Sequence, residues 1–449
     1  MQYGASRHSL IAALVVTGLL LSAACDLDPA NENNPTEEEV LSTAEGIRTL
    51  TVGMQEFYAT DALNATIPRA MGITSREIAI NNTFSNLIEM EAGGTDLPTS
   101  NVNIESMWST NYRVVSMAEN VLANAPDVNL TAETRSGIVA TARLFKAMAL
   151  GNIALAFEQA PMTTSRDGTA EFVPRQQVLQ EAITLLDDAL SRLDSTVPSD
   201  DFRNNILATG LSLRNTIHAY RARFHLLVGN DQDAIDAANQ VDPTVASQFN
   251  YDDRSQNPFW QEFIRSGDLA PRDSFGTRLT EPGDSLRLNF FTNPEDALST
   301  PNELPIEGPD GFYTSASSPF PLYVPGELPL IRAEAKLSMN GATQEVVDEI
   351  DRVRTDSLGS DDIPSPFGIA AELSPYNGPM TEEALRTEIL RQRRAELYLL
   401  GTGLADNRRL GPEVNNRQDP GPFERSRNFY PYPDQERRNN PNTPESPEF

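Results

Sequence analysis

Residues 381–411 read TEEALRTEILRQRRAELYLLGTGLADNRRLG, and this stretch gives the clearest indication of the fold. Thr381 is a suitable N-cap, and the two glutamates after it lie where the positive end of a helix dipole favours acids. Apolar residues then recur at helical spacing, at Leu385, Ile389, Leu397 and Leu400. Gly401 is a natural helix stop. The stretch therefore predicts an amphipathic helix that begins after Thr381 and ends at Gly401.

Helical patterns also precede this stretch. Residues 329–339 and 344–354 form two helical runs separated by Asn340 and Gly341. Between about residues 40 and 240, apolar and small residues recur every three or four positions, for example at 138, 142, 145, 149 and 153. A run at 211–228 is followed by Gly229 and by another run at 234–241. Repeated helix–turn–helix units predict a mainly all-α fold with a tetratricopeptide-like helical-repeat scaffold, although no clean period of about 34 residues is present.

Two segments lack this periodicity. Residues 242–328 hold eleven prolines and 12 of the 32 aromatic residues of the chain, and residues 412–449 hold eight prolines. We therefore expect one domain at 40–449, in which long irregular loops are inserted into the helical scaffold. Its parts are a helical-repeat part (40–241), irregular aromatic-rich loops (242–328), C-terminal helices (329–411) and a Pro-rich tail (412–449).

The N-terminus has the order of a secretory signal. Arg7 is followed by the apolar run 10–21 and by the small residues 22–24. Cys25, the only cysteine, comes next, where a lipoprotein signal peptidase would cut. We expect residues 1–24 to be removed and Cys25 to carry the lipid that anchors the chain. Residues 25–39 contain six acids and no base after the cysteine, which predicts a flexible acidic tether.

The formal net charge of −29 excludes some partners. Such a surface repels nucleic acid and anionic lipid headgroups. We therefore expect no nucleic-acid partner, and contact with a membrane through the lipid anchor only. Without disulfides, stability must come from a hydrophobic core.

No residue pattern indicates catalysis, a metal or a cofactor. His218 and His225 lie seven residues apart on one predicted helix, whereas a helical zinc pair has a spacing of four. We expect both to lie on a helix face that is partly in the core. Asp and Glu are so abundant that any pair of them is uninformative. The sequence therefore predicts a protein that is not an enzyme.

Aromatic residues in the irregular segment are the first candidates for a binding surface. Aromatic rings stack on sugars and grip extended peptides when loops of a rigid scaffold expose them. The best candidates are Phe259, Trp260, Phe312 and Tyr313. The alternative is that these rings fasten the long loops by packing on the helices.

The order of motifs in the C-terminal third resembles the SusD/RagB family of outer-membrane nutrient-binding lipoproteins. That family typically ends with Glu-Arg-Arg, a hydrophobic residue and Glu-Leu, then a Gly, a later Asp, and Arg-Arg with a closing Gly. The matching residues, at the same spacing, are Gln392, Arg393, Arg394, Ala395, Glu396, Leu397, Gly401, Asp406, Arg408, Arg409 and Gly411. Gln392 and Leu400 replace family glutamates and Gly403 replaces an arginine, so part of the expected ion-pair network is missing.

Further blocks follow the order of the family. Residues 331–335 (IRAEA) with Gly341, and 350–354 (IDRVR), are similar to its Ala-Glu-Ala and Asn-x-Val-Arg helices. Residues 431–433 (PYP), Glu436 and 440–441 (NP) are similar to its terminal Pro-Ile-Pro, Glu and Asn-Pro. Trp108, Tyr112 and 119–120 (EN) are similar to its Trp, Tyr and Ala-Asn helix, and 143–161 to its helix that ends before a Pro. These motifs are structural in the family, so the resemblance identifies the fold and leaves the ligand open.

The resemblance implies a lipid-anchored protein of the outer membrane that faces the cell surface. It would sit as a lid over a SusC-like, TonB-dependent transporter and deliver an oligomeric nutrient, an oligosaccharide or a peptide. Ligand contacts in the family come from loops that correspond to about 74–103 and 251–323. The first of these offers Arg76, Asn82 and Asp96 as polar partners. The alternative hypothesis is a helical-repeat scaffold lipoprotein that organises other envelope proteins without binding a nutrient.

Overall fold

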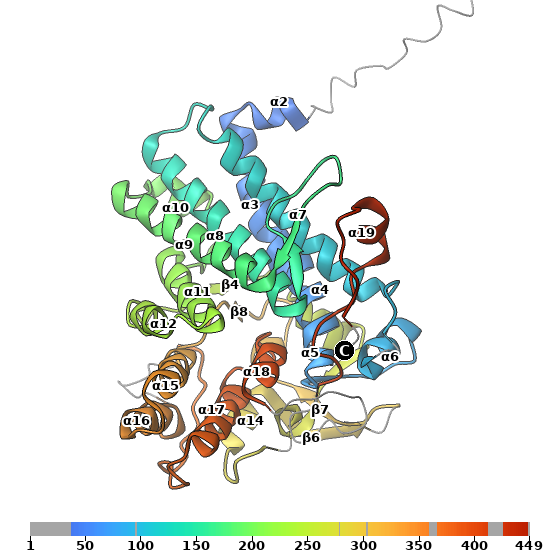
Figure 1. Ribbon diagram of the computed structural model, residues 1–449, viewed down its shortest axis with the longest axis vertical. Helices are drawn as coiled ribbons and strands as arrows, with labels where there is room; N and C mark the ends of the chain where they lie inside the picture. The colour runs from blue at the N-terminus through green and yellow to red at the C-terminus, as the bar shows by residue number, and fades with distance from the viewer. Residues whose placement is uncertain are drawn as a thin grey trace, which may run out of the picture.

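The computed structural model describes residues 37–94, 97–277, 279–301, 304–358, 366–411 and 425–447 (Figure 1). The expected signal peptide, Cys25 and most of the expected tether lie outside the described residues, as does Asp96. The last residues of the expected tether are helical, because α2 spans Glu37–Leu41.

The N-terminal part is built around one long, interrupted helical run that packs on α7 (Val102–Asn124). The run begins with α3 (Ala44–Phe57), which the Thr43 side chain caps by accepting a hydrogen bond from the Gly46 N–H. Its remaining segments are η1 (Tyr58–Ala62), α4 (Leu63–Thr66), η2 (Ile67–Met71) and α5 (Gly72–Thr74). The π-helical turns η1 and η2 alternate with α-helical ones, and Pro68 in η2 removes a backbone donor there.

The following helices form stacked antiparallel pairs (Figure 1). They are α8 (Ala132–Ala156) with α9 (Arg175–Ser195), α11 (Leu213–Val228) with α12 (Asp231–Ala238), and α15 (Glu327–Asn340) with α16 (Gln344–Arg354). Short α10 (Asp200–Asn205) packs on α8. The apolar stripe predicted on α8 at 138, 142, 145, 149 and 153 is fully buried. The mainly helical fold is therefore confirmed, while a tetratricopeptide-like repeat stays a prediction.

Helix α8 is long and apolar enough to cross a membrane by length and composition. Its apolar window is 83% buried within the protein, which identifies it as a central core helix. The two histidines on α11, His218 and His225, are both buried, as expected for a helix face partly in the core.

The predicted C-terminal helix ends earlier than expected. Thr381 caps it, but α17 covers Glu382–Glu396 and does not continue to Gly401. The helix is capped at Leu397, and Leu399, which has a left-handed φ of 62°, then turns the chain towards α18 (Gly403–Leu410). The turn places the buried Tyr398 hydroxyl where it donates to the backbone oxygens of Glu77 and Arg272. A tertiary contact therefore outweighs the local helical pattern.

The C-terminal motif residues hold the body together. Arg393 pairs with Asp406 at 3.0 Å, which joins α17 to α18. Arg394 donates to the backbone oxygens of Phe275 and Ser75 at 2.8 and 2.7 Å. These arginines are 2% and 5% exposed, so they stabilise the packing of the interior and do not contact a ligand.

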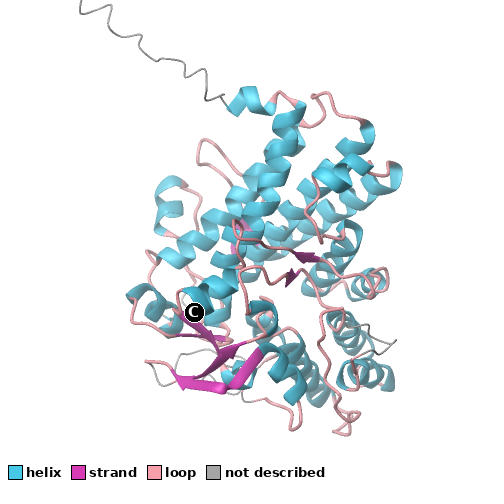
Figure 2. Ribbon diagram, turned by 180° about the vertical axis from the view of Figure 1, so that it is seen from behind, coloured by secondary structure: helices cyan, strands magenta, loops and turns pink. Residues whose placement is uncertain are grey.

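The segment expected to be irregular contains short helices and strands of two to eight residues. Figure 2 shows the longer strands together at the lower edge of the molecule and a short strand pair nearer its middle. Its helical elements are α13 (Pro258–Trp260), η4 (Gln261–Arg265), η5 (Asp273–Gly276), α14 (Ser285–Phe291) and η6 (Gly311–Tyr313). All sheets in the described residues have two antiparallel strands. They pair β1 (Ile78–Ile80) with β5 (Leu269–Pro271), β2 (Gln159–Pro161) with β3 (Phe172–Pro174), β4 (Gln248–Phe249) with β8 (Phe320–Pro321), and β6 (Thr292–Ser299) with β7 (Pro305–Pro309).

The described part of the tail, residues 425–447, packs on the helical body. The Tyr430 N–H donates to the Ala156 oxygen at the end of α8, and Tyr432 is buried. Helix α19 (Asp434–Asn439) follows and lies beside α7 (Figure 1). One core of buried side chains thus extends from Leu41 to Tyr432.

Candidate functional site

The two segments expected to contact a ligand, 74–103 and 251–323, meet in the fold. Strand β1 from the first pairs with β5 from the second. Beyond the strand, the Asn81 N–H donates to the Asp268 oxygen at 2.7 Å, and the Asn81 side chain donates to the Gly267 oxygen at 3.2 Å. These segments therefore form one continuous surface.

Three of the four candidate rings do not reach that surface. Phe259, Phe312 and Tyr313 are 0%, 5% and 0% exposed. The Phe259 ring lies 4.8 Å from the Tyr313 ring and stacks on Phe320 at 5.0 Å between ring centres. For these three rings the alternative hypothesis is correct: they pack on the helices and so fasten the long Pro-rich segment to the body of the protein.

Trp260 is the fourth candidate and remains a prediction. It is partly exposed at the end of α13, where the Asn257 side chain accepts hydrogen bonds from the Phe259 and Trp260 N–H groups. Arg76 is also partly exposed and has a left-handed φ of 62°. The side-chain oxygen Oδ1 of Asn82 accepts from the Phe84 N–H at 2.9 Å, so this side chain shapes the turn before α6 (Ser85–Ala92).

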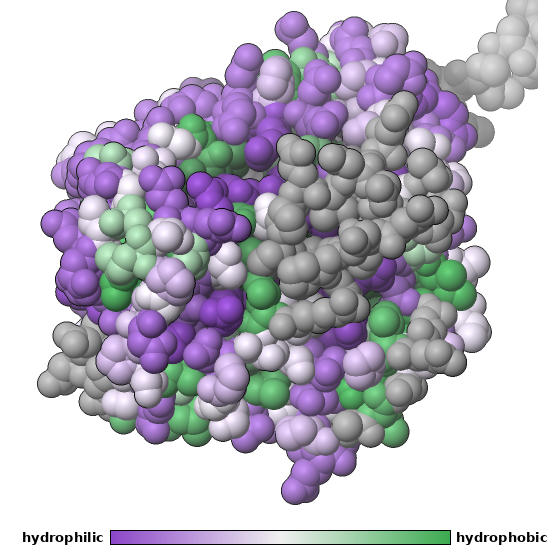
Figure 3. Space-filling view, turned by 60° about the horizontal axis from the view of Figure 1, so that its bottom comes forward, coloured by the Kyte–Doolittle hydropathy of each residue, from purple (hydrophilic) through white to green (hydrophobic). Residues whose placement is uncertain are grey.

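An exposed apolar patch, which sequence reasoning did not identify, lies on this surface. We define it as Phe84, Ile88 and Val102, which are 55%, 39% and 57% exposed. Ile264, which is 45% exposed, belongs to the second of the two segments. Phe84 and Ile88 are one turn apart at α6. The Asn101 side chain, next to Val102, donates to the Asn86 oxygen and so holds the start of α7 against α6. The face in Figure 3 carries mainly hydrophilic residues with small separate hydrophobic areas. Three large exposed apolar side chains on α6 and at the start of α7 indicate an interaction site.

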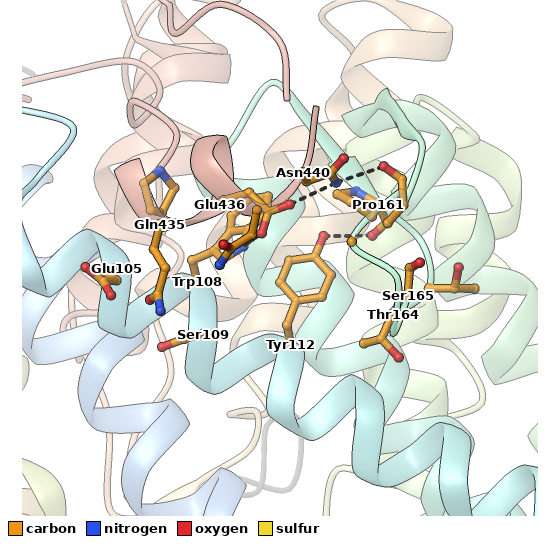
Figure 4. Close-up of a pocket in the computed structure, with 15 residues that line it drawn as sticks. Glu105, Trp108, Ser109, Tyr112, Pro161, Thr164, Ser165, Gln435, Glu436 and Asn440 are labelled. Atoms are coloured by element: carbon orange, nitrogen blue, oxygen red, sulfur yellow. Dashed lines mark hydrogen bonds between the residues drawn. The ribbon is translucent and has the colours of Figure 1, made fainter. Parts of the chain in front are cut away.

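A hollow of about 330 Å³ opens further along α7 (Figure 4). Its walls come from the first turns of α7, the loop between β2 and β3, and α19. Val102, Glu105 and Ser109 are spaced by three and four residues, so the patch and the hollow share one side of α7. The lining residues are Glu105, Trp108, Ser109, Tyr112, Pro161, Thr163, Thr164, Ser165, Gly168, Ala170, Pro433, Gln435, Glu436, Asn439 and Asn440.

Backbone contacts fix the loop against the tail on one side of the hollow. The Asn440 and Asn442 side chains donate to the oxygens of Ala170 and Thr169, each at 2.9 Å. Gly168 has a left-handed φ of 70°, and a Cβ there would lie 2.4 Å from the Asn439 oxygen. Only glycine therefore allows the loop to approach α19 this closely.

The aromatic wall of the hollow is Trp108 with Tyr112, whose ring centres are 4.7 Å apart. Trp108 is 5% exposed, stacks on Phe172, and donates from Nε1 to Glu436 Oε2 at 3.1 Å. Tyr112 is partly exposed and donates from its hydroxyl to the Pro161 oxygen at 2.7 Å (Figure 4). Burial raises the pKa of Tyr112 well above its usual value, and the negative charge of Glu436 raises it further. The Tyr112 hydroxyl therefore stays protonated.

The sequence held a partial signal for this hollow. Trp108 and Tyr112 belong to one motif of the family resemblance, and Glu436 and Asn440 belong to another. Both were interpreted as structural, and they do join α7 to the tail. Their second consequence, a hollow with an aromatic wall, depends on the meeting of residues 328 positions apart.

The fold and the hollow define a mainly helical protein with stacked helix pairs and an aromatic-walled hollow between α7, the β2–β3 loop and the tail. No family model and no curated relative matches the chain. Several solved structures, however, are similar to this chain. A SusD-like carbohydrate binding protein from Bacteroides vulgatus is 14% identical, with a TM-score of 0.66 over 89% of this chain and 96% of that chain. A SusD-like carbohydrate binding protein from Bacteroides fragilis is 15% identical, with a TM-score of 0.63 over 90% and 99%.

A SusD homolog from Bacteroides thetaiotaomicron is similar to the same extent, with 12% identity and a TM-score of 0.66 over 93% of this chain and 100% of that chain. The chain therefore has the SusD-like fold along nearly its whole length. This confirms the fold that the C-terminal motifs indicate.

Proposed function

We propose that this protein is an outer-membrane lipoprotein that binds an oligomeric nutrient and delivers it to a SusC-like, TonB-dependent transporter. The observation that carries the proposal is the SusD-like fold along nearly the whole chain, which it shares with carbohydrate-binding proteins. The signal peptide and the single cysteine at position 25 supply the expected lipid anchor, with the body facing the cell surface.

The arrangement of the surface supports binding without chemical change. A hollow with an aromatic wall and amide, hydroxyl and carboxylate groups suits a sugar or peptide unit. The apolar patch on the same side of α7 suits a protein partner, because burial of large exposed apolar side chains in an interface lowers the free energy. We assign the hollow to the nutrient and the patch to the transporter.

The experiment has two parts. The mature lipidated chain, purified in mild detergent, is screened on glycan and peptide arrays, and its membrane partners are identified by pull-down. We expect a bound oligomer that is released unaltered, and a co-purified β-barrel whose recovery falls when Phe84 and Val102 are changed to Ser. Exposed Val197 provides a matched control, since it is 68% exposed and lies at a distant helix end.

Three results would refute the proposal. Recovery of no barrel would exclude the role as a transporter lid. Recovery of other envelope proteins, with no ligand on either array, would favour a helical scaffold lipoprotein instead. Release of cleaved product would show that the protein is an enzyme.

A further inference from the structure

A second hollow, of about 420 Å³, lies along the stack of α12, α15 and α16 (Figure 1). Its apolar lining comes from α12, from the turn after it and from the first turn of α15, and includes Ile235, Val241 and Leu328. It shares no lining residue with the hollow beside α19. We call it the basic pocket, because its charged side chains are three cations and one carboxylate.

The four charged side chains come from the facing sides of α15 and α16. Glu349 on α16 accepts from Arg332 Nε on one oxygen at 3.0 Å and from Lys336 Nζ on the other at 2.8 Å. Arg352 Nε lies 3.8 Å from the same carboxylate. Arg332 and Lys336 are one turn apart on α15, a spacing at which like charges repel each other. One carboxylate therefore serves three cations, which leaves an excess of two positive charges.

The nearest carboxylates in the sequence do not remove this excess. Asp242 and Asp348 do not line the basic pocket, and they accept hydrogen bonds from Thr244 and Gln344. Several other ion-pair networks in the described part of the chain hold at least as many carboxylates as cations. Examples are Arg223 with Glu327, Arg287 with Asp284 and Glu396, and Arg354 and Arg391 with Glu281 and Glu388. The charge of the basic pocket therefore favours an anionic ligand.

The two arginines also have donors left for a ligand. Glu349 pairs with Nε of Arg332 and of Arg352, and the terminal nitrogens of both make no hydrogen bond with any described residue. These side chains are 14% and 49% exposed, so a ligand can reach them from solvent. Two terminal N–H groups of a guanidinium match the two oxygens of a carboxylate.

The remaining lining suits the body of a sugar. The apolar side chains can cover the C–H face of a sugar ring, and the Asn239 amide can both donate to and accept from hydroxyl groups. A volume of about 420 Å³ is in the range of small-molecule sites. Charges more than about 8 Å apart are largely screened in physiological salt, so the local cations outweigh the net charge of −29 at this site.

We propose that the basic pocket binds a sugar unit that carries a carboxylate, as in an oligomer of uronic acid. The terminal nitrogens of Arg332 and Arg352 donate to the carboxylate, and the sugar ring packs on the apolar lining. The proposal rests on the proposed nutrient-binding function, and it adds a second site with a substrate class of its own.

The test compares two ligands that differ in charge. The mature lipidated chain in mild detergent is titrated by calorimetry at neutral pH with a galacturonate trimer, and with the methyl ester of the same trimer. We expect the acid form to bind at least about tenfold more tightly, because esterification removes a charge-assisted hydrogen bond. Arg332→Gln and Arg352→Gln should each weaken binding of the acid form about tenfold and leave binding of the ester unchanged.

Arg386→Gln is the matched control, because Arg386 is exposed on α17 and does not line the basic pocket. Arg352→Gln removes only the 3.8 Å pairing with Glu349, so it tests the site even if Arg332→Gln disturbs the packing of α15 on α16.

Equal binding of the acid and the ester would overturn the proposal, as would tight binding of the acid that neither substitution weakens. Loss of a co-purified protein in the Arg352→Gln variant, without uronate binding by the unsubstituted chain, would assign the pocket to an acidic protein segment and overturn the sugar assignment. Binding of neutral glycans alone would refute this inference and leave the proposed function standing.

Discussion

Replacing Gly151 with alanine tests how closely α8 and α11 are packed. Gly151 lies in the middle of α8, where alanine would ordinarily stabilise the helix by about 1 kcal/mol. A Cβ at this position would lie 2.3 Å from Phe224 Cζ and 2.7 Å from Cε1. Carbon atoms in contact are about 3.5–4.0 Å apart, so the ring would have to move by more than about 1 Å.

Phe224 has little room for that movement, since it is 1% exposed and packs edge-on against Tyr220. Overpacking a core costs about 1–3 kcal/mol, and a contact this short belongs at the upper end. After subtraction of the propensity gain, Gly151→Ala should lower the free energy of unfolding by about 2 kcal/mol. Urea unfolding followed by circular dichroism would measure it.

Gly53→Ala is the matched control. Gly53 lies inside α3, and the nearest atom to its added Cβ is Met117 Cε at 4.0 Å. This substitution should raise the free energy of unfolding by up to about 1 kcal/mol. In a Phe224→Leu background, Gly151→Ala should lose most of its cost. If Gly151→Ala stabilised the protein as Gly53→Ala does, the close packing of α8 on α11 would be refuted.

Three further predictions concern buried charges. Glu327 accepts hydrogen bonds at 2.7 Å from both Nε and a terminal nitrogen of Arg223. Glu327→Gln should lower the free energy of unfolding by about 3–5 kcal/mol, because it leaves Arg223 buried without its counter-charge. A decrease of less than about 1 kcal/mol in urea unfolding would contradict this prediction. Burial, opposed by Arg287, raises the pKa of Glu396 to about 7 from 4.5, so the folded state binds the proton more tightly and stability falls as pH rises from 4.5 to 7. Glu396→Gln should remove this loss of stability, which amounts to up to roughly 3 kcal/mol. If the pH dependence of unfolding were unchanged in the variant, this role of Glu396 would be excluded. Burial, with the charges of Arg221 and Arg214, lowers the pKa of His218 to about 4 from 6.5, so stability present above pH 6.5 is lost as pH falls towards 4. At pH 4, the His218→Gln variant should therefore retain about 2 kcal/mol more stability than the unsubstituted protein, as measured by thermal melts. An equal loss of stability in both proteins would contradict this prediction.

Local patterns predicted most of the helices. The apolar stripe of α8 is buried at every predicted position, and Thr381 caps α17 as expected. The end of α17 was wrong because a distant contact, the hydroxyl of Tyr398 on the backbone of Glu77, decides where the chain turns. A periodicity in the sequence carries no information on such a contact.

The candidate site was harder to predict than the fold. The pairing of β1 with β5 joins the two segments expected to contact ligand, but three of the four chosen rings are in the core. Composition identifies a loop rich in aromatic residues, and it does not decide which rings face inward. That choice depends on partners such as Phe320, which covers the face of Phe259.

The sequence by itself determined the helical patterns and the motifs of a SusD-like fold, because each depends on residues close together in the chain. It also predicts a lipoprotein signal and an acidic surface. Only the tertiary structure decided where a ligand could bind. Trp108 and Glu436 meet across 328 positions, and the loop that closes the hollow depends on the approach of Gly168 to α19. Such a site is a property of the packed surfaces, so it becomes apparent only when the neighbours of each side chain are known.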